Sequence, residues 1–316
     1  MSELRRTLTL AGTPASEREI ERQKRSNSNA VHQHEAFASH RRQLTDLLMA
    51  RPEAGAPSAG GPRLCVLGAG NCGDLDLERL ASRYRSIHLV DLDADALERA
   101  RERQSASTRA VLVPVAPLDL SGLLEPLERW QKRQVTPDEL LAHPERTALG
   151  IARALGGPFD VVVSACVLSQ MHLSVRNVLT DAHPLFQAAS YTLNLTHLRT
   201  LSLLAKPGEG VALLVSDVAT EQMAPLSGSR QHVDFRALLE HLLRIGAVFD
   251  AVRPDVIVSI ACDDPSLVHE LGLSSIVDAW VWQNGPRRAF LVYALELPRL
   301  SAGQKLETGQ NCETLR

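Results

Sequence analysis

The chain has 316 residues, of which 44% are hydrophobic and 22% charged, and a formal net charge of -3. This length allows one substantial buried core with room for an extension. The small negative charge argues against general attraction to phosphate backbones, so nucleic acid is not an expected partner. No apolar run reaches the roughly 18 residues of a membrane span, and the polar N-terminus has no signal core. We therefore expect a cytoplasmic protein without a membrane partner.

The cysteines and the N-terminal histidines do not form a metal-binding pattern. The five cysteines are an odd number with irregular spacing and no CxxC pair, which is typical of reduced thiols. His32, His34 and His40 are two and six residues apart, so they do not share one helical face. The sequence predicts no metal site, and it favours a solvated or substrate-facing helix for these histidines.

The first 50 residues differ in composition from the rest of the chain. Nothing breaks a helix between Ser16 and Met49, so we expect one or two helices in an N-terminal extension over residues 1–50 that could act as a lid. Residues 51–62 are rich in Pro, Gly and Ala and read as a linker.

From Arg63 onward, short apolar runs alternate with helical stretches, which is typical of βα units that build a parallel sheet. The expected strands are Arg63–Leu67, Ser86–Val90, Ala110–Val115, Phe159–Ser164 and Gly210–Ser216. The expected helices are Leu75–Arg83, Ala94–Arg103, Pro137–Leu155, Phe186–Ala205 and Asp234–Ile245. This core domain is expected to span residues 63–300, followed by a polar tail over 301–316.

The end of the domain has a different pattern. Ser275–Gln283 and Arg288–Leu297 are rich in Val, Ile and aromatic residues, and only four residues that begin with Asn284-Gly285 separate them. Asn-Gly between two such runs predicts a hairpin, which can only be antiparallel. The fold class is therefore a doubly wound, mostly parallel α/β sheet that ends in an antiparallel hairpin.

The loop after the first strand is the strongest functional signal. Gly68-Ala69-Gly70-Asn71 joins the strand to a helix, and glycines there let the backbone turn tightly and approach a ligand. Asp91 ends the second strand about 20 residues later, where a carboxylate can accept both ribose hydroxyl protons. Asp93 is better explained as the N-cap of the next helix.

These two elements suit a dinucleotide oxidoreductase as well as an S-adenosylmethionine enzyme. The segments Val66-Leu-Gly-Ala-Gly-Asn71 and Leu89-Val-Asp-Leu-Asp-Ala94 resemble the first two motifs of class I S-adenosylmethionine-dependent methyltransferases. Val115 to Leu120 resembles the adenine-binding third motif, and Phe159 to Gln170 resembles the fourth. The closing hairpin also fits that family, whose last strand is antiparallel.

The resemblance implies S-adenosylmethionine as the cofactor and a seven-stranded sheet. The residues that it implies for cofactor binding are Gly68, Ala69, Gly70, Asn71, Asp91, Leu92, Asp119, Leu120, Ser164, Ala165 and Cys166. Ala116 and Pro117 stand where the third motif usually has its acid, so Asp119 is either an adenine contact or the cap of its own loop.

Methyl transfer needs alignment and sometimes a base, so no universal catalytic residue is expected. His172 and Asp217 follow the fourth and fifth strands and are the candidates for catalysis, although either could be structural. Gln170, after the fourth strand, and Tyr191 and His197 are candidates for substrate binding. The long helix that contains Tyr191 and His197 could close over the pocket or be solvated on its polar side.

The range of possible methyl acceptors is limited mainly by motifs that the sequence lacks. The chain has neither the Asn/Asp-Pro-Pro-aromatic element of enzymes that methylate DNA bases nor the paired-glutamate loop of protein arginine methyltransferases. The sequence therefore predicts a methyltransferase that acts on O or N of a small molecule or peptide, and it leaves a homodimer open. The alternatives are an NAD(P)-dependent oxidoreductase and a non-catalytic S-adenosylmethionine-binding regulatory protein.

Overall fold

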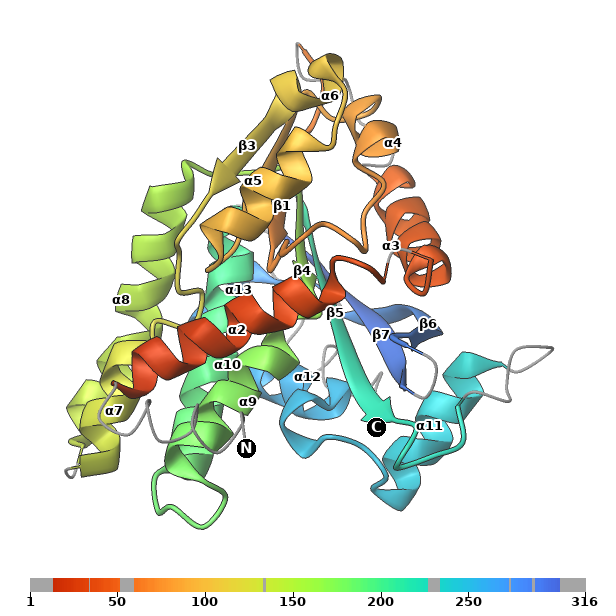
Figure 1. Ribbon diagram of the computed structural model, residues 1–316. Coiled ribbons are helices and arrows are strands. Elements are labelled where there is room, and N and C mark those ends of the chain that lie inside the picture. The colour runs from red at the N-terminus through yellow and green to blue at the C-terminus, as the bar shows by residue number, and fades with distance from the viewer. Residues whose placement is uncertain are drawn as a thin grey trace.

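A single seven-stranded sheet forms the centre of the computed structural model, which describes residues 14–33, 35–51, 60–132, 135–226, 234–272, 274–285 and 288–301. The strand order is β3-β2-β1-β4-β5-β7-β6 (Figure 1). The strands are β1 (Arg63–Leu67), β2 (Ser86–Val90), β3 (Leu112–Val115), β4 (Val161–Ala165), β5 (Val211–Thr220), β6 (Ser275–Gln283) and β7 (Ala289–Pro298).

Strands β1 to β5 run parallel, whereas β7 lies between β5 and β6 and is antiparallel to both. The predicted fold class is confirmed, because this strand order with an antiparallel β7 is the class I methyltransferase fold. The hairpin turn begins at Asn284, whose amide donates to the Arg288 carbonyl at 2.7 Å. Gly285 has a φ of 114°, a left-handed conformation that favours glycine at this position.

The sheet is buried on both faces, and its side chains alternate between two apolar layers. Leu64 and Val66 of β1 pack into one layer, while Cys65 and Leu67 pack into the other. The same alternation holds in β4, where Val162 lies on the opposite face from Val161 and Val163. A period of two with apolar residues on both faces is the pattern of a central parallel strand.

Helices cover both faces. The helices packed on the face of Cys65 and Val162 are α7 (Leu124–Lys132), α8 (Pro137–Leu155), α9 (Val167–Leu179), α10 (Phe186–Leu204), α12 (Pro254–Asp263) and α13 (Pro265–Glu270). The helices on the other face are α3 (Ala38–Met49), α4 (Leu77–Ala81), α5 (Ala94–Glu102) and α6 (Ala106–Val111). The remaining helix of this region, α11 (Phe235–Ile245), packs against the β6–β7 hairpin.

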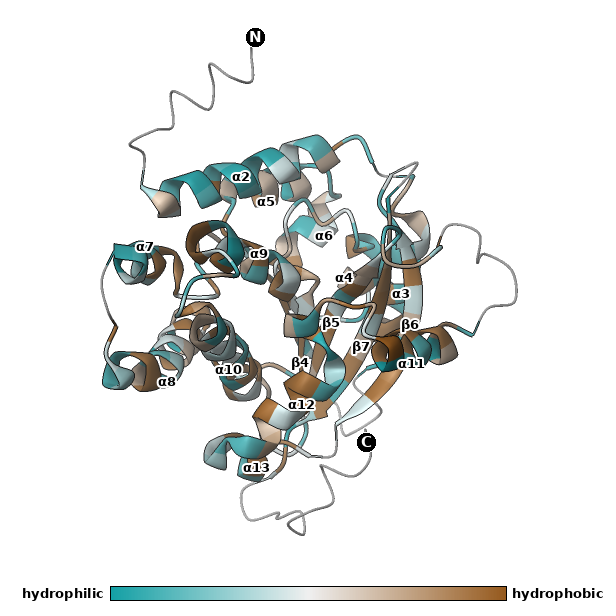
Figure 2. Ribbon diagram, turned by 90° about the horizontal axis from the view of Figure 1, so that it is seen from below, coloured by the Kyte–Doolittle hydropathy of each residue, from teal (hydrophilic) through white to brown (hydrophobic). Residues whose placement is uncertain are grey.

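The N-terminal extension contributes two helices with different surroundings. Helix α3 belongs to the core, because Leu44 and Leu48 are fully buried beside α4 and β6. Helix α2 (Ala15–Ala30) crosses the carboxyl ends of the strands and is almost entirely hydrophilic (Figure 2). The extension is therefore one helix packed into the core and one polar helix that lies over the sheet edge. The linker over residues 52–59 and the tail over 302–316 lie outside the described residues.

Three sequence expectations need correction. Strand β3 begins at Leu112, because Ala110 and Val111 belong to α6. Strand β5 continues to Thr220, so Asp217 lies inside the strand rather than after it. His40 is neither solvated nor substrate-facing: it is fully buried, its Nδ1 accepts a hydrogen bond from Trp280 Nε1 at 2.9 Å, and burial lowers its pKa to about 3. The exposed His32 fits the solvated interpretation, and His34 lies outside the described residues.

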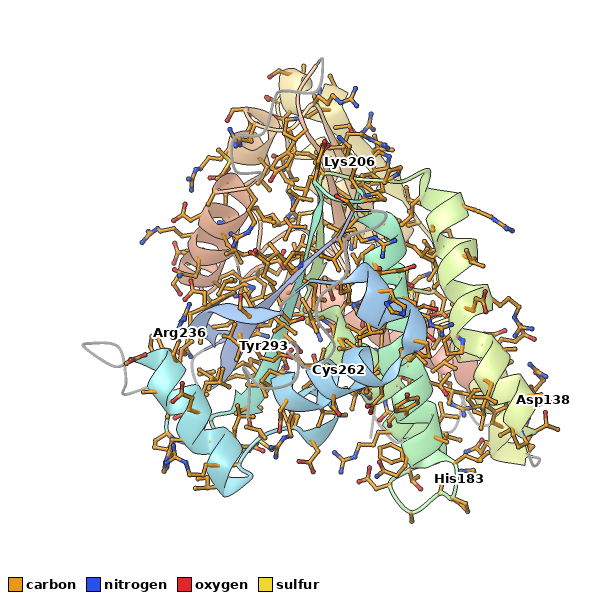
Figure 3. The ribbon with its side chains drawn as sticks, turned by 180° about the vertical axis from the view of Figure 1, so that it is seen from behind. Asp138, His183, Lys206, Arg236, Cys262 and Tyr293 are labelled. Atoms are coloured by element: carbon orange, nitrogen blue, oxygen red, sulfur yellow. The ribbon has the colours of Figure 1, made fainter. Side chains whose placement is uncertain are left out.

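Strand β7 also fixes the segment that follows α11. Tyr293 is fully buried near the middle of the molecule, as the view from behind shows (Figure 3), and its hydroxyl donates to the Val252 carbonyl at 2.8 Å. Val252 ends the short 3-10 helix η1 (Asp250–Val252).

No described helix is both long enough and apolar enough to span a membrane. The four cysteines in the described part of the chain form no disulfide with one another.

Candidate functional site

The glycine loop packs tightly between two elements of the sheet edge. The amides of Gly68 and Ala69 both donate to the Val90 carbonyl at the end of β2, at 2.9 and 3.0 Å. Gly68 has a φ of 81°, and a Cβ added there would lie 2.4 Å from Cβ of Val167 at the start of α9. This position therefore requires glycine, because the loop backbone touches the next helix.

Asp91 holds the loop from the other side. Its Oδ2 accepts the Gly70 amide at 2.8 Å and its Oδ1 accepts the Asp93 amide at 2.9 Å. The residue is only 4% exposed, and burial raises the pKa of its carboxyl group although both amides oppose the shift. Asp93 caps α5 through the Ala96 amide, as predicted.

Asp119 supports its own loop in this structure. Its Oδ1 accepts the amide and the hydroxyl of Ser121, at 2.9 and 2.6 Å, and its Oδ2 accepts the Leu124 amide at 3.1 Å. These are the bonds of a loop that leads into α7. The side chain still lines a cavity, so a cap and a ligand contact are compatible there.

A narrow cavity of about 60 Å³, which we call the slot, lies beside these two acids. Its walls are mainly apolar and include Gly68, Asp91, Leu92, Leu118, Asp119, Leu120, Val167 and Met171. Glu19 and Gln23 of α2 close it from above. An apolar crevice with the buried carboxylate of Asp91 suits a nucleoside, but a volume of about 60 Å³ holds one only if α2 or its side chains shift.

A much larger cavity of about 1160 Å³ adjoins the slot, and Gly68 and Gln170 line both. It contains ten of the residues that the sequence singled out: Gly68, Ala69, Gly70, Asn71, Ala165, Cys166, Gln170, His172, Tyr191 and Asp217. Ligand pockets for small molecules usually measure roughly 300–1,000 Å³. This larger cavity has room for an acceptor beside the glycine loop.

Two carboxyl groups of the large cavity lie near Cys166. Asp217 is 8% exposed, sits beside a β-bulge between Asp217 and Ala219, and accepts the Ser169 hydroxyl at 2.5 Å. Asp74 directly follows the glycine loop, and burial together with the charge of Asp91 raises its pKa to about 7. Burial and the charges of Asp217 and Asp74 raise the pKa of the Cys166 thiol, so Cys166 is not an activated nucleophile.

His172 is held by a fixed hydrogen-bond chain. Its Nε2 lies 2.8 Å from Oδ1 of Asn194, whose Nδ2 donates to the Ala251 carbonyl at 2.9 Å. That orientation makes Oδ1 an acceptor, so Nε2 carries the proton and Nδ1 is the free acceptor. Nδ1 is buried without a partner in the described part of the chain, and burial lowers the pKa of the ring to about 4.

Ser164 and His197 lie behind the cavity wall. Both are completely buried, the Ser164 hydroxyl lies 2.8 Å from Nε2 of His197, and neither residue lines the slot or the large cavity. Burial, with a smaller contribution from the charge of His172, lowers the pKa of His197 to about 3. In this structure the pair joins β4 to α10, whereas Tyr191 and Asn194 of the same helix face the cavity.

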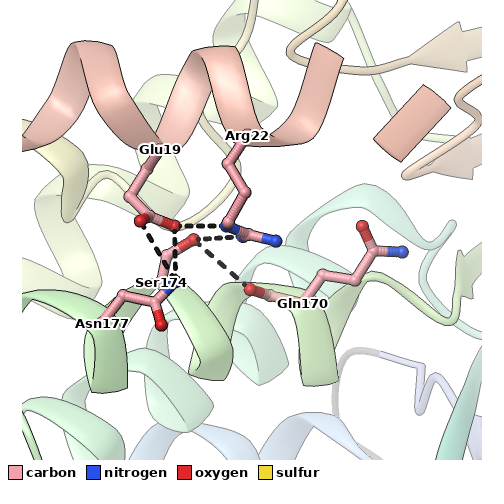
Figure 4. A network of polar contacts seen from close by, with 5 residues as sticks. All are labelled: Glu19, Arg22, Gln170, Ser174 and Asn177. Atoms are coloured by element: carbon pink, nitrogen blue, oxygen red, sulfur yellow. Dashed lines mark hydrogen bonds and ion pairs between the residues drawn. The ribbon is translucent and has the colours of Figure 1, made fainter. Parts of the chain in front are cut away.

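Helix α2 is fastened over the site by polar contacts. Glu19 accepts Asn177 Nδ2 at 3.1 and 3.2 Å and Arg22 Nε at 2.7 Å, and Arg22 donates to Ser174 at 3.1 Å (Figure 4). At its other end, Asn27 donates to Oδ2 of Asp93 at 3.0 Å. These bonds place α2 directly above both cavities.

Sequence reasoning missed several residues of the site. Asn27, Phe37, Asp74 and Trp282 all line the large cavity. Asp74 was detectable, because an acid directly follows the Gly73 of the loop. Asn27 and Phe37 come from the N-terminal extension and Trp282 comes from the strand before the Asn284-Gly285 turn, and only the tertiary structure brings them to the glycine loop. No group of three metal-ligand side chains occurs in the residues that the structure describes.

Comparison with known proteins gives structural likeness but no relative. No family model matches the chain, and no curated protein matches it. Similar solved structures include TrmN from Thermus thermophilus, with 17% identity and a TM-score of 0.36 over 82% of this chain and 48% of that one.

Two further structures are an O-methyltransferase family protein from Burkholderia thailandensis and magnesium protoporphyrin IX methyltransferase from Synechocystis PCC 6803 with bound SAH. The first has 14% identity and a TM-score of 0.39 over 89% of this chain and 60% of that one. The second has 13% identity and a TM-score of 0.40 over 84% and 86%. The chain thus spans about half of TrmN and 60% of the second protein. At these identities and TM-scores, the likeness identifies no function.

Proposed function

We propose that the chain is an S-adenosylmethionine-dependent methyltransferase that acts on O or N of a small-molecule or peptide acceptor. The observation that carries this proposal is the position of Asp91. Its buried carboxylate borders an apolar slot, and the slot meets a cavity of about 1160 Å³ at the glycine loop. A nucleoside and an acceptor held in these two spaces would meet at Gly68 and Gln170.

The residues present fit the cofactor chemically. Asp91 would accept the ribose hydroxyl protons, while Leu92, Asp119 and Leu120 would face the base. The backbone from Gly68 to Asn71, together with Ala165 and Cys166, would border the amino-acid part. When bound, the cofactor supplies an activated methyl group.

Alignment of the acceptor then falls to the wall of the large cavity. Asp217 is the better of the two catalytic candidates, because its carboxylate faces the cavity and can take a proton from an acceptor. His172 would act as a positioning residue, since its Nε2 is committed to Asn194 and its Nδ1 is buried. Gln170 and Tyr191 would contact the acceptor, and Ser164 and His197 would support the wall from behind.

The extension over residues 1–50 would act as a lid through α2 only. Glu19 and Gln23 leave the slot too narrow for a nucleoside, so cofactor entry requires this helix or its side chains to move. Helix α3 would stay in place because its apolar side chains are part of the core. We propose that the methyltransferase domain spans residues 63–300 and that α3 of the extension packs against it.

The test of this function is calorimetric binding of S-adenosylhomocysteine, with NAD and NADP as comparison ligands. Binding of S-adenosylhomocysteine at micromolar concentration is expected, and stabilisation by NAD or NADP alone would instead establish the oxidoreductase alternative. Asp91→Ala should weaken the affinity more than about tenfold, because two charge-assisted hydrogen bonds are lost. Asp95→Ala is the matched control, since Asp95 is exposed one helical turn further on.

The burial of both His172 nitrogens favours one second candidate, a regulatory protein that binds the cofactor without turnover. The two candidates differ in methyl transfer to a broad acceptor panel in the presence of labelled S-adenosylmethionine. Cofactor binding without transfer to any acceptor would favour the regulatory candidate.

A further inference from the structure

The inner end of the large cavity carries negative charge that its own surroundings do not balance. Asp74 and Asp217 both line this cavity, and both act on the Cys166 thiol. No ion pair joins either carboxylate to a cation in the described ranges between residues 14 and 301. Asp217 is buried and Asp74 is partly exposed. Poorly solvated carboxylates without an ion-pair partner among the described residues are costly, so a bound cation would be favoured there.

The arginines that line this cavity form no ion pair with Asp74 or Asp217 among the described residues. Arg22 is bonded to Glu19 and Ser174, and Arg176 pairs with Asp181. The Arg288 guanidinium lies over the Phe290 ring at 5.2 Å from its centroid. Its charge lowers the pKa of Asp217, but burial outweighs it. Arg41 donates to the Gly73 carbonyl at 2.8 Å and likewise only partly offsets the burial of Asp74.

An aromatic wall stands beside the two acids. Phe37, Trp282 and Phe290 all line the cavity. The ring centroid of Trp282 lies 5.3 Å from that of Phe37, edge to face, and 5.5 Å from that of Phe290, and the Trp282 ring also stacks on His40 at 4.6 Å. Phe37 also packs on the loop, because a Cβ at Gly73 would lie 3.0 Å from its ring. Aromatic faces attract ammonium groups, most strongly where water is excluded.

We propose that the methyl acceptor carries an alkylammonium group, which Asp74 and Asp217 hold against the wall formed by Phe37, Trp282 and Phe290. This inference rests on the proposed function and names the class of acceptor for that site. One of the two carboxylates accepts a proton from the ammonium, which leaves a neutral amine nitrogen with a free lone pair and a protonated carboxyl group. The net charge does not change in this proton transfer, because one anion and one cation become two neutral groups.

Benzylamine and benzyl alcohol are suitable probes because they differ only in the cationic nitrogen. Binding to the full chain is measured by calorimetry at pH 7.5, with and without S-adenosylhomocysteine. Benzylamine is expected to bind at least about tenfold more tightly than benzyl alcohol, as expected for one partly desolvated ion pair. Equal affinities of the two probes would overturn the proposal.

Carboxylate-to-amide variants locate the cation. Asp217→Asn keeps an acceptor for the Ser169 hydroxyl, and Asp74→Asn removes only the charge, so both variants are expected to fold. Each should reduce benzylamine affinity about fivefold or more and leave benzyl alcohol unchanged. Asp181→Asn is the matched control, since Asp181 lines the same cavity but is exposed and paired with Arg176. An equal loss in the control would show a general charge effect and would overturn the proposal.

The ammonium of the cofactor itself could occupy the same acids, and S-adenosylhomocysteine distinguishes this case. If Asp74→Asn and Asp217→Asn weaken S-adenosylhomocysteine and not benzylamine, the acids serve the cofactor and the acceptor assignment is overturned. If wild-type protein does not bind S-adenosylhomocysteine at all, the proposed function fails whatever the amine does. Tight cofactor binding with no preference for benzylamine would remove the acceptor class alone.

Discussion

The slot and the large cavity meet at Gly68 and Gln170, yet they are built differently. The slot has few ionisable groups, and backbone amides occupy both oxygens of its main acid, Asp91. The large cavity is lined by aromatic rings and by acids such as Asp74 and Asp217, which form no ion pair with any residue that the structure describes. The slot is thus narrow and closed by α2, whereas the large cavity is wide and contains acids that have no ion-pair partner among the described residues. The contrast indicates that the first selects by shape and the second by charge.

The largest expected effect is a loss of stability at acidic pH, and it arises from histidines in and behind the wall of the large cavity. Burial lowers the pKa of His172 to about 4 and of His197 to about 3, below the unfolded value of 6.5. Below pH 6.5 the unfolded chain therefore binds more protons than the folded chain. The free energy of unfolding decreases as the pH is lowered through that range. Between pH 7 and pH 5, each histidine should cost about 2 kcal/mol of unfolding free energy.

Urea denaturation at the two pH values checks this. His197→Gln keeps a donor near Ser164, and it should reduce the pH dependence by roughly one histidine's share. A variant with the full wild-type dependence would show that His197 titrates normally.

The next effect concerns the shape of the loop. Gly68→Ala should cost about 3 kcal/mol and abolish S-adenosylhomocysteine binding, because the new Cβ would lie 2.4 Å from Val167 at a φ of 81°. Thermal denaturation and calorimetry measure the two losses. Gly150→Ala is the control, since no atom lies within 4 Å of a Cβ at this helical site, and it should be neutral or stabilising. Near-wild-type stability of Gly68→Ala would mean that the loop is not rigid.

A smaller effect is expected from the charge of the large cavity. The folded pKa of Asp74 is raised to about 7, so its ionisation destabilises the ligand-free protein as the pH rises from about 4 to 7. The melting temperature of Asp74→Asn should therefore be a few degrees above that of wild type at pH 8. At pH 4 the two melting temperatures should be the same. The charge of Asp91 raises the pKa of Asp74 and the charge of Arg41 lowers it, so these two charges should not reverse the direction of the shift. A lower melting temperature at pH 8 would contradict the unbalanced charge.

The smallest effect concerns the helix over the slot. Glu19→Ala removes the bonds to Asn177 and Arg22, and it should cost about 1 kcal/mol. The same change widens the slot, so the association rate of S-adenosylhomocysteine in stopped-flow measurements should rise a few-fold. Glu21→Ala is the control, because Glu21 is exposed and only 3.8 Å from Lys24 in a surface pair. An unchanged rate would show that α2 does not limit entry.

Much of the fold was predictable because it follows from local patterns. Apolar runs and turn residues located β1, β2, β6 and α8 to the residue. The Asn284-Gly285 turn required an antiparallel hairpin, and the Gly68 loop with Asp91 identified the sheet edge where a ligand would bind. Helices α6, α7, α9, α12 and α13 were not predicted, although Leu127 and Trp130 give α7 an apolar face at helical spacing.

The sequence alone determined the parallel sheet, its antiparallel end and the glycine loop, because periodicity, turn chemistry and a strand-loop-helix junction are local properties. The tertiary structure alone decided which polar residues reach the loop. Packing sent Ser164 and His197 behind the wall, and it brought Asn27, Phe37 and Trp282 to the cavity from distant segments. Burial also raised the pKa of Asp74, and the sequence does not show how deeply a carboxyl group is buried. Contacts and desolvation depend on the whole fold, so no local pattern predicts them.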